Sequence, residues 1–181
     1  CYSPGTPSEI WATEFDKYVA KGDDHIRLIK QIVSHGHTST LEHISFTFAV
    51  EGISRSLLAQ LTRHRIGFSY SVQSQRYVNH KSARGGFDYV TPPSIKTIGS
   101  GLGMEQAIFE DIMEDLQIAY DALIGLGIKP EDARYVLPNA ATTNITLTMN
   151  LRAFMDFYKK RNSSTHAQRE IAELAEMLKD E

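Results

Sequence analysis

Hydrophobic residues recur at helical spacing in several segments of the chain. The longest pattern runs from Met104 to Leu126, where apolar residues follow every three or four positions and acidic residues fill the opposite side. A second pattern covers Asp24 to Ser34, with isoleucines and a valine on one face. Further helices are predicted over Ser39–Glu42, which has capping-box spacing, from Ser54 to Gly67, from Pro130 to before Pro138, from Leu151 to Tyr158, and from Thr165 onward.

Alternation of apolar and polar residues indicates two strands. From Ser45 to Val50 and from Asn144 to Asn150, every second residue is apolar, and Gly52 is expected to end the first strand. The segment 68–81 is polar and aromatic and has no clear period, which predicts a loop that passes into an extended stretch. Because strands and helices mix without a regular β-α-β rhythm, the pattern favours an α+β fold.

The composition is typical of a globular domain. Of 181 residues, 41% are apolar and 23% are charged, and the formal net charge is −3. This length fits one domain or two tightly fused halves with a sizeable core, and we expect a single domain over 1–181. The charge balance excludes a general basic field for nucleic acid or membrane surfaces, and no apolar run approaches the roughly 20 residues that span a bilayer. The only cysteine, Cys1, excludes an intrachain disulfide and a cysteine-built metal site, which suits a reducing compartment.

The segment 60–77 combines basic, hydroxyl and amide side chains at high density. Gln60, Arg63 and His64 would project from one side of a helix, and Arg76 follows in a loop of serine, glutamine and tyrosine. A guanidinium can hold a phosphate through two hydrogen bonds, and the neighbouring side chains can donate to phosphate oxygens. A basic helix end that only complements the helix dipole is an alternative, but the polar loop favours a bound ligand.

Other polar residues have structural explanations when each is considered alone. Three histidines between His35 and His43 lie near Glu42, but their spacing fits no standard zinc pattern, so we expect no metal site. Asn150 stands at a strand-to-helix junction and is suited to cap the helix. Neither a GxGxxG nor a Walker A sequence is present, so a nucleotide or flavin would need a different kind of binding site.

Taken together, these segments resemble the flavin-dependent thymidylate synthase family. The family signature is Arg-His-Arg, then seven or eight residues, then Ser, and Arg63-His64-Arg65 and Ser74 match it with an eight-residue gap. Other segments match the family in order and spacing: Gly36-His37-x-Ser39-x-x-Glu42-His43, Gly52-Ile53-Ser54-Arg55-Ser56, Ala133-Arg134-x-Val136-Leu137-Pro138, Asn150-x-Arg152, and Arg161 with His166-Ala167-Gln168. The resemblance therefore covers nearly the whole chain.

The resemblance implies an α+β fold with a central, mostly antiparallel sheet flanked by helices, and a homotetramer that binds FAD at its subunit interfaces. It implies a cytoplasmic enzyme that converts dUMP to dTMP, with methylenetetrahydrofolate as carbon donor and NADPH as reductant. The flavin would relay the hydride. It also implies that the chain is trimmed before Cys1 and that a C-terminal tail could be absent.

The resemblance also assigns site residues. The predicted dUMP-binding residues are Gln60, Arg63, Gln73, Ser74, Gln75, Arg76, Arg134 and Arg161. The predicted FAD-binding residues are His37, Ser39, Arg63, His64, Arg65, Asn150, Arg152, Asp156 and His166. Arg161 is the predicted catalytic residue, because a fixed guanidinium would stabilise the negative charge that hydride delivery builds on the uracil ring. Between Arg161 and His166 the chain has one residue more than the family pattern.

Two other functional classes remain as alternatives. A nucleotide or RNA-loop binding module would use the same arginines without catalysis, and its oligonucleotide affinity would depend steeply on salt. A hydrolase with a histidine-bound metal would contain stoichiometric metal. The flavoenzyme interpretation instead predicts a yellow protein whose visible absorbance is bleached by NADPH in air-free buffer.

Overall fold

The structure is a computed structural model that describes residues 5–20, 24–78, 80–81, 85–97 and 103–181. The chain divides into two compact units, Cys1–Ile44 and Ser45–Glu181, each with its own internal contacts. The expectation of a single domain over 1–181 remains a prediction. Cys1 lies outside the described residues.

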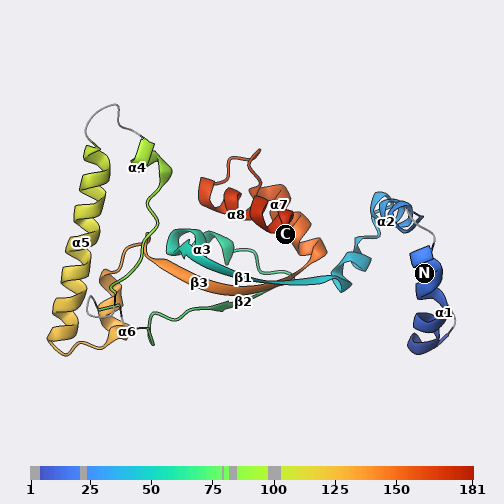
Figure 1. Cartoon of the computed structure of the whole chain (residues 1–181), viewed down its shortest axis with the longest axis horizontal. Coiled ribbons are helices and arrows are strands. Elements are labelled where there is room, and N and C mark those ends of the chain that lie inside the picture. The colour runs from blue at the N-terminus through green and yellow to red at the C-terminus, as the bar shows by residue number, and fades with distance from the viewer. Residues whose placement is uncertain (1–4, 21–23, 79, 82–84, 98–102) are drawn as a thin grey trace. The chain divides into compact units, whose positions relative to one another are not determined.

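The first unit is helical (Figure 1). It contains α1 (Pro7–Ala20), α2 (Asp24–Ser34) and the 3-10 helix η1 (Thr38–His43). The helices predicted over 24–34 and 39–42 are therefore confirmed, whereas the hydrophobic pattern gives no prediction for α1. Leu41 is buried, but Ile26 and Ile29 are 43% and 50% exposed, so much of the apolar face of α2 is exposed.

The second unit is built on a three-stranded sheet. Its strands are β1 (Ser45–Ser54), β2 (Phe68–Val72) and β3 (Thr142–Asn150), in the order β1-β3-β2. The central strand β3 pairs antiparallel with both neighbours. The α+β class and the antiparallel sheet are therefore confirmed.

Two strands differ from the prediction in their extent. β1 continues past Gly52, because its register with β3 shifts between Val50 and Ile53 and Gly52 takes a left-handed φ of +69°. The Gly52 N–H donates to Asn144 Oδ1 of β3 at 3.0 Å. The glycine therefore forms a bulge and does not end the strand. The loop predicted over 68–81 is wrong at its start, because Phe68–Val72 pairs with β3 over its whole length.

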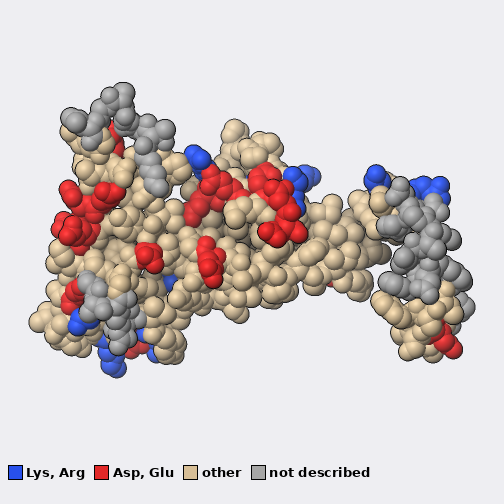
Figure 2. Space-filling model, viewed as in Figure 1, with Lys and Arg blue, Asp and Glu red and all other residues tan. Residues whose placement is uncertain are grey.

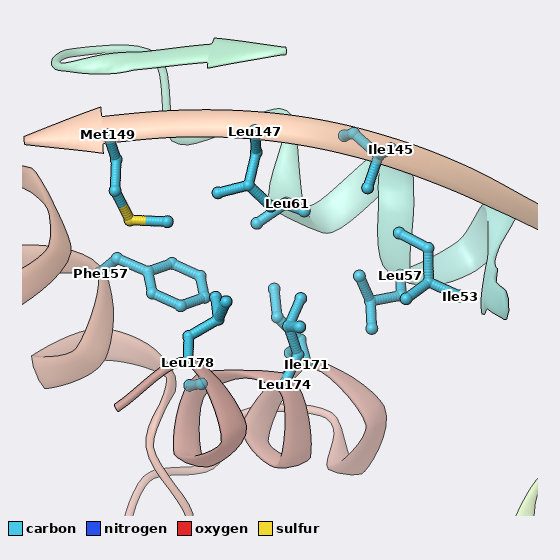
Figure 3. Close-up of a cluster of buried hydrophobic side chains, with 11 residues drawn as sticks. Ile53, Leu57, Leu61, Ile145, Leu147, Met149, Phe157, Ile171, Leu174 and Leu178 are labelled. Atoms are coloured by element: carbon cyan, nitrogen blue, oxygen red, sulfur yellow. The ribbon is translucent and has the colours of Figure 1, made fainter. Parts of the chain in front are cut away.

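Three helices cover one face of the sheet and form the main core. They are α3 (Arg55–Leu61), α7 (Leu151–Arg161) and α8 (Arg169–Asp180) (Figure 1). Figure 3 shows their apolar side chains meeting those of β3. The large side chains that are almost fully buried include Leu57, Leu61, Leu147, Met149, Phe157 and Ile171. Since the apolar residues of β3 all point into this core, the predicted alternation explains the packing.

The ends of α7 and α8 are set by side-chain caps. Asn150 Oδ1 accepts the Ala153 N–H at 2.8 Å, which confirms the predicted N-cap of α7. α8 begins at Arg169 after the capping residue Gln168, so the predicted start at Thr165 is wrong. The Thr165 hydroxyl instead donates to the Asn162 carbonyl at 2.8 Å and closes a turn between the two helices.

A smaller core joins the remaining helices of this unit. They are α4 (Pro93–Thr97), α5 (Met104–Gly125), α6 (Pro130–Ala133) and the 3-10 helix η3 (Arg134–Val136). The predicted long helix is confirmed as α5, and Pro130 occupies the first turn of α6 as expected. Phe87, Met113 and Ala141 are buried in the core beside α5. Within the described ranges, none of the helices combines the length and apolar character that crossing a bilayer requires.

Candidate active site

The Arg63-His64-Arg65 motif lies in the turn between α3 and β2. The helix ends at Leu61, and the N–H groups of Arg63 and His64 bond to carbonyls three residues earlier, at 3.4 and 3.0 Å. These tight bonds close the last turn and let the chain reverse into β2. The prediction that the helix continues to Gly67 is therefore wrong.

Tyr70 and Gly67 fix this turn. The Tyr70 hydroxyl lies 2.9 Å from the Leu61 carbonyl oxygen and 2.6 Å from that of His64. Burial raises the pKa of Tyr70, so the phenol stays a neutral donor. Gly67 has φ +75°, and a Cβ there would lie 2.7 Å from the Ala153 Cβ. Only glycine therefore fits between the turn and the start of α7.

His64 and Arg161 meet beside the core although they are 97 residues apart in the chain. Arg161 Nε donates to His64 Nε2 at 3.1 Å. Because a guanidinium can only donate, His64 accepts as the neutral imidazole with its proton on Nδ1. Burial lowers the pKa of His64, and the charges of Arg161 and Lys160 lower it further. The Phe157 ring meets the imidazole edge-on, with 5.0 Å between centroids.

The other predicted site residues at this end of β2 differ in their contacts and in their exposure. Asn150 caps α7 through its Oδ1, and Asp156 pairs with Lys160 at 2.6 Å. Gln60 is half-buried, while Arg63, Arg65, Arg152 and His166 are exposed. The exposed arginines of the turn and of the start of α7 make this end of the sheet suited to an anionic ligand.

At the other end of β2, Gln73 is anchored to β3. Its N–H donates to the Asn144 carbonyl at 2.9 Å, and its side-chain Oε1 accepts the Asn144 N–H at 3.3 Å. Its carbonyl accepts Arg55 Nη2 at 3.1 Å. Gln73 therefore uses its backbone groups and side-chain oxygen within the chain and serves first as the anchor of the loop that follows.

That loop brings Arg76 close to Arg134. Arg76 Nε pairs with Glu131 Oε2 at 2.7 Å, and Arg134 Nε donates to the Glu131 carbonyl at 2.9 Å. The Arg76 N–H donates to Ser74 Oγ at 3.2 Å, which folds the loop back on itself. Two arginines predicted to bind dUMP thus both bond to Glu131, one to its carboxylate and one to its main-chain carbonyl, and Ser74 and Gln75 in the loop are half-buried.

The sequence motifs assign no role to Arg55, although the residue lies within one of the segments that match the family. It is half-buried at the first position of α3 and contacts Gln73. Arg134 is close enough for its charge to lower the pKa of Arg55, after the larger effect of burial. The signal in the sequence is an arginine directly after the capping Ser54, but its partners are distant in the chain.

The two groups of predicted residues lie at opposite ends of β2. The strand has five residues, so at roughly 3.3 Å per residue its ends are about 13 Å apart. A single chain therefore brings His64 to Arg161, and Arg76 to Arg134, but does not bring Arg161 to Arg76.

His37 and Ser39 belong to the first unit, where both are exposed. The His37 ring stacks on His35 with 6.5 Å between centroids. Across the part of the chain that the structure describes, no group of three or more histidine, cysteine or acidic residues could hold a metal ion.

Comparisons with known proteins agree with the resemblance of the motifs. The family model for thymidylate synthase complementing proteins (Thy1) matches residues 1–181. The flavin-dependent thymidylate synthase of Clostridium tetani is 42% identical, over 99% of this chain and 73% of that protein. The one from Geobacter sulfurreducens is 44% identical, over 90% and 71%. The solved structure of the UMP/dUMP methylase PolB from Streptomyces cacaoi, bound with 5-Br dUMP, superposes with a TM-score of 0.70 at 27% identity, covering 88% of this chain and 74% of that one.

Proposed function

The chain belongs to the thymidylate synthase complementing protein family, and on that premise we propose that it is a flavin-dependent thymidylate synthase that methylates dUMP to dTMP. The observation that carries the proposal is the match of the family model to residues 1–181, which includes the signature from Arg63 to Ser74. The geometry of the two ends of β2 supports it further.

The loop 74–76 and Arg134 suit the phosphate of dUMP. Arg76 bonds the Glu131 side chain and Arg134 bonds the Glu131 main chain, so both guanidinium groups lie around one residue, and Ser74 adds a hydroxyl donor. Guanidinium groups bind phosphate oxygens through paired, charge-assisted hydrogen bonds. An arriving phosphate dianion would compete with Glu131 for Arg76, whose side chain is 54% exposed and therefore accessible.

The turn 63–65 suits the anionic part of FAD. Arg63 and Arg65 are exposed there, Arg152 is exposed on the adjoining first turn of α7, and the neutral His64 has its imidazole fixed by Arg161. These donors fit a negatively charged dinucleotide. Bound FAD would supply the relay of a hydride from NADPH to the uracil ring of dUMP, and we infer that the carbon unit comes from methylenetetrahydrofolate.

Arg161 suits the proposed catalytic role because its position is fixed. It is half-buried at the end of α7, and its Nε bond to His64 orients the guanidinium plane. A preorganised cation in a water-poor site stabilises charge that develops during the reaction without a reorganisation cost. Arg161 would in this way stabilise the negative charge that forms on the uracil ring of dUMP.

We infer that a complete site combines residues of two copies of the chain in a homotetramer. Arg161 and the phosphate-binding arginines are separated by the length of β2 within one chain. Residues of one end from one copy and of the other end from a neighbour would complete a site around a single dUMP. A cytoplasmic location accords with the proposed substrates.

The acidic surfaces do not favour the RNA-module alternative. Figure 2 shows carboxylates gathered over α5 and α8, two of the helices exposed on that face. A polyanion would be repelled from both helices. The arginines at the ends of β2 thus suit a small anion better than a long nucleic acid.

The test incubates the purified protein with FAD, dUMP, methylenetetrahydrofolate and NADPH and measures dTMP by chromatography. We expect dTMP from the complete mixture and none when any one reactant is omitted. Absence of dTMP from FAD-loaded protein would refute the proposal. Light scattering under the same conditions tests the tetramer, because an active monomer would exclude a site shared between copies.

A further inference from the structure

Arg55 projects from a rigid base at the start of α3. The hydroxyl and N–H of Ser54, which caps the helix, donate to the Glu170 carboxylate at 2.6 and 2.8 Å. The Arg55 N–H donates to the Ala141 carbonyl at 3.0 Å. α8 and the segment before β3 therefore both fix the point from which the arginine side chain extends.

The guanidinium of Arg55 reaches the residue directly before the loop 74–76. Its Nη2 donates to the Gln73 carbonyl at 3.1 Å, and the hydroxyl of the buried Thr143 lies 3.5 Å from the same oxygen. Because the Gln73 N–H and side-chain Oε1 are also bonded to Asn144 of β3, the residue as a whole is held by three neighbours. Arg55 thus supplies one of the bonds that position the loop.

Arg55 lies close to two other basic groups, Arg134 and His80. Its Nε is buried without a hydrogen-bond partner among the described residues, and the same is true of His80 Nε2. Burial lowers the pKa of both groups. The charge of Arg134 lowers the pKa of Arg55 further. The charge of Arg55 lowers the pKa of His80, while a bond to the Gly86 backbone and the charge of Asp88 oppose that effect. Basic groups that repel one another in this way favour the binding of an anion nearby.

We propose that Arg55 is a positioning residue for the phosphate of dUMP. It holds the Gln73 carbonyl, and with it the loop 74–76, and it places a half-buried positive charge near Arg134. The inference rests on the proposed function, since it takes the anion to be the phosphate of dUMP. A loop that is already in place loses less entropy when the phosphate binds, and the inner charge strengthens the local positive potential.

The test compares binding of dUMP and of deoxyuridine, which lacks the phosphate, to the FAD-loaded full chain by calorimetry. Arg55→Met keeps the aliphatic stem and removes the charge and the donor, whereas Arg55→Lys keeps the charge and one donor. We expect Arg55→Met to weaken dUMP binding at least about tenfold, as for loss of a charge-assisted hydrogen bond. Deoxyuridine binding should change by less than about twofold, and Arg55→Lys should recover most of the dUMP affinity.

The matched control is Arg169→Met, because Arg169 pairs with Glu173 on the exposed side of α8 and should bind both ligands as the wild type does. If Arg55→Met weakens dUMP and deoxyuridine equally, Arg55 only supports the fold and the inference is overturned. Unchanged dUMP affinity overturns it as well. If Arg55→Met does not fold, Arg55→Gln, which keeps a donor without the charge, is expected to show the same selective loss. A wild type that binds no dUMP refutes the proposed function itself, so the two failures are distinguishable.

Discussion

At the end of β2 nearer α3, the guanidinium of Arg161 donates to a neutral imidazole. At the other end, Arg76 pairs with the Glu131 carboxylate and Arg134 donates to the Glu131 main-chain carbonyl. In the first arrangement Arg161 and His64 bond to each other within the chain, and this bond fixes the orientation of both side chains. The second leaves more positive charge than its carboxylate balances, and the half-buried Arg55 adds to that excess.

The difference indicates that the two ends of β2 have different functions. A satisfied pair is suited to hold a group still while charge develops beside it. An unbalanced cluster is suited to take up an anion, because binding removes the repulsion between the cations. The end with Arg161 is therefore expected to govern turnover, and the end with Arg76 to govern affinity.

The largest expected effect comes from removing the guanidinium of Arg161. Arg161→Ala should lower kcat by about a thousandfold, as for the loss of one preorganised donor, and should change dUMP affinity by less than about threefold. Arg76→Ala should show the reverse pattern. Steady-state kinetics and calorimetry on the same preparations measure both quantities.

Lys160→Ala serves as the control for this pair, because Lys160 neighbours Arg161 in sequence but pairs with the exposed Asp156. It is expected to resemble the wild type in kcat and in affinity. Equal losses of kcat and affinity in Arg161→Ala would mean that Arg161 only binds substrate, and the division of labour between the two ends would be wrong.

A smaller effect is expected on stability at the turn before β2. In Gly67→Ala the new Cβ would meet the Ala153 Cβ at 2.7 Å, with φ at +75°. Strain and overpacking together should lower the free energy of unfolding by about 3 kcal/mol. Urea denaturation followed by circular dichroism measures it.

Gly127→Ala is the matched control, since Gly127 has φ +86° and no atom lies within 4 Å of the position that a Cβ would take there. It should cost only the backbone strain, about 1 kcal/mol. If the two variants lose the same free energy of unfolding, the turn before β2 relaxes away from α7, and this end of β2 is not rigid.

The smallest expected effect is a pH dependence of stability. Because the pKa of His64 is lowered in the folded chain, the unfolded chain binds more protons as the pH falls through its ordinary value of about 6.5. Stability is therefore fully present above that pH and decreases on acidification from pH 7.5 to 5.5. Urea denaturation at both pH values measures the decrease.

His64→Gln should make that decrease smaller. His80→Gln, near the other end of β2, should act in the same direction, because burial also lowers the pKa of His80. His166→Gln, at an exposed position, is the control and should leave the decrease as it is in the wild type. A decrease that none of these variants alters would show that other groups determine the acid sensitivity.

Regular elements with a strong local pattern were predictable from the sequence. The alternation from Asn144 to Asn150 predicted β3, the helical spacing from Met104 predicted α5, and the asparagine at the strand-to-helix junction predicted the cap of α7. In each case the residues that set the structure are neighbours in the chain, so the local pattern and the tertiary packing agree.

Elements decided by distant contacts were not predictable in the same way. Arg63 and His64 continue the helical spacing of α3, but the helix ends before them. The contacts of the Tyr70 hydroxyl and the close approach of Gly67 to α7 fix a turn there instead. Gly52 suggests a strand end, yet Asn144 accepts its N–H across the sheet. Arg55 donates to a carbonyl 18 residues away, a contact that no local pattern reveals.

The bulge-free strand β2 has a consequence for how the motif can vary in length. Every residue of Phe68–Val72 pairs with β3, so an insertion inside the strand would advance the loop by about 3.3 Å and turn each following side chain to the opposite face. Gains and losses of a residue between Arg65 and Ser74 must therefore be absorbed in the turns on either side. The strand β2 therefore keeps the distance between the two arginine groups constant while the lengths of the turns on either side change.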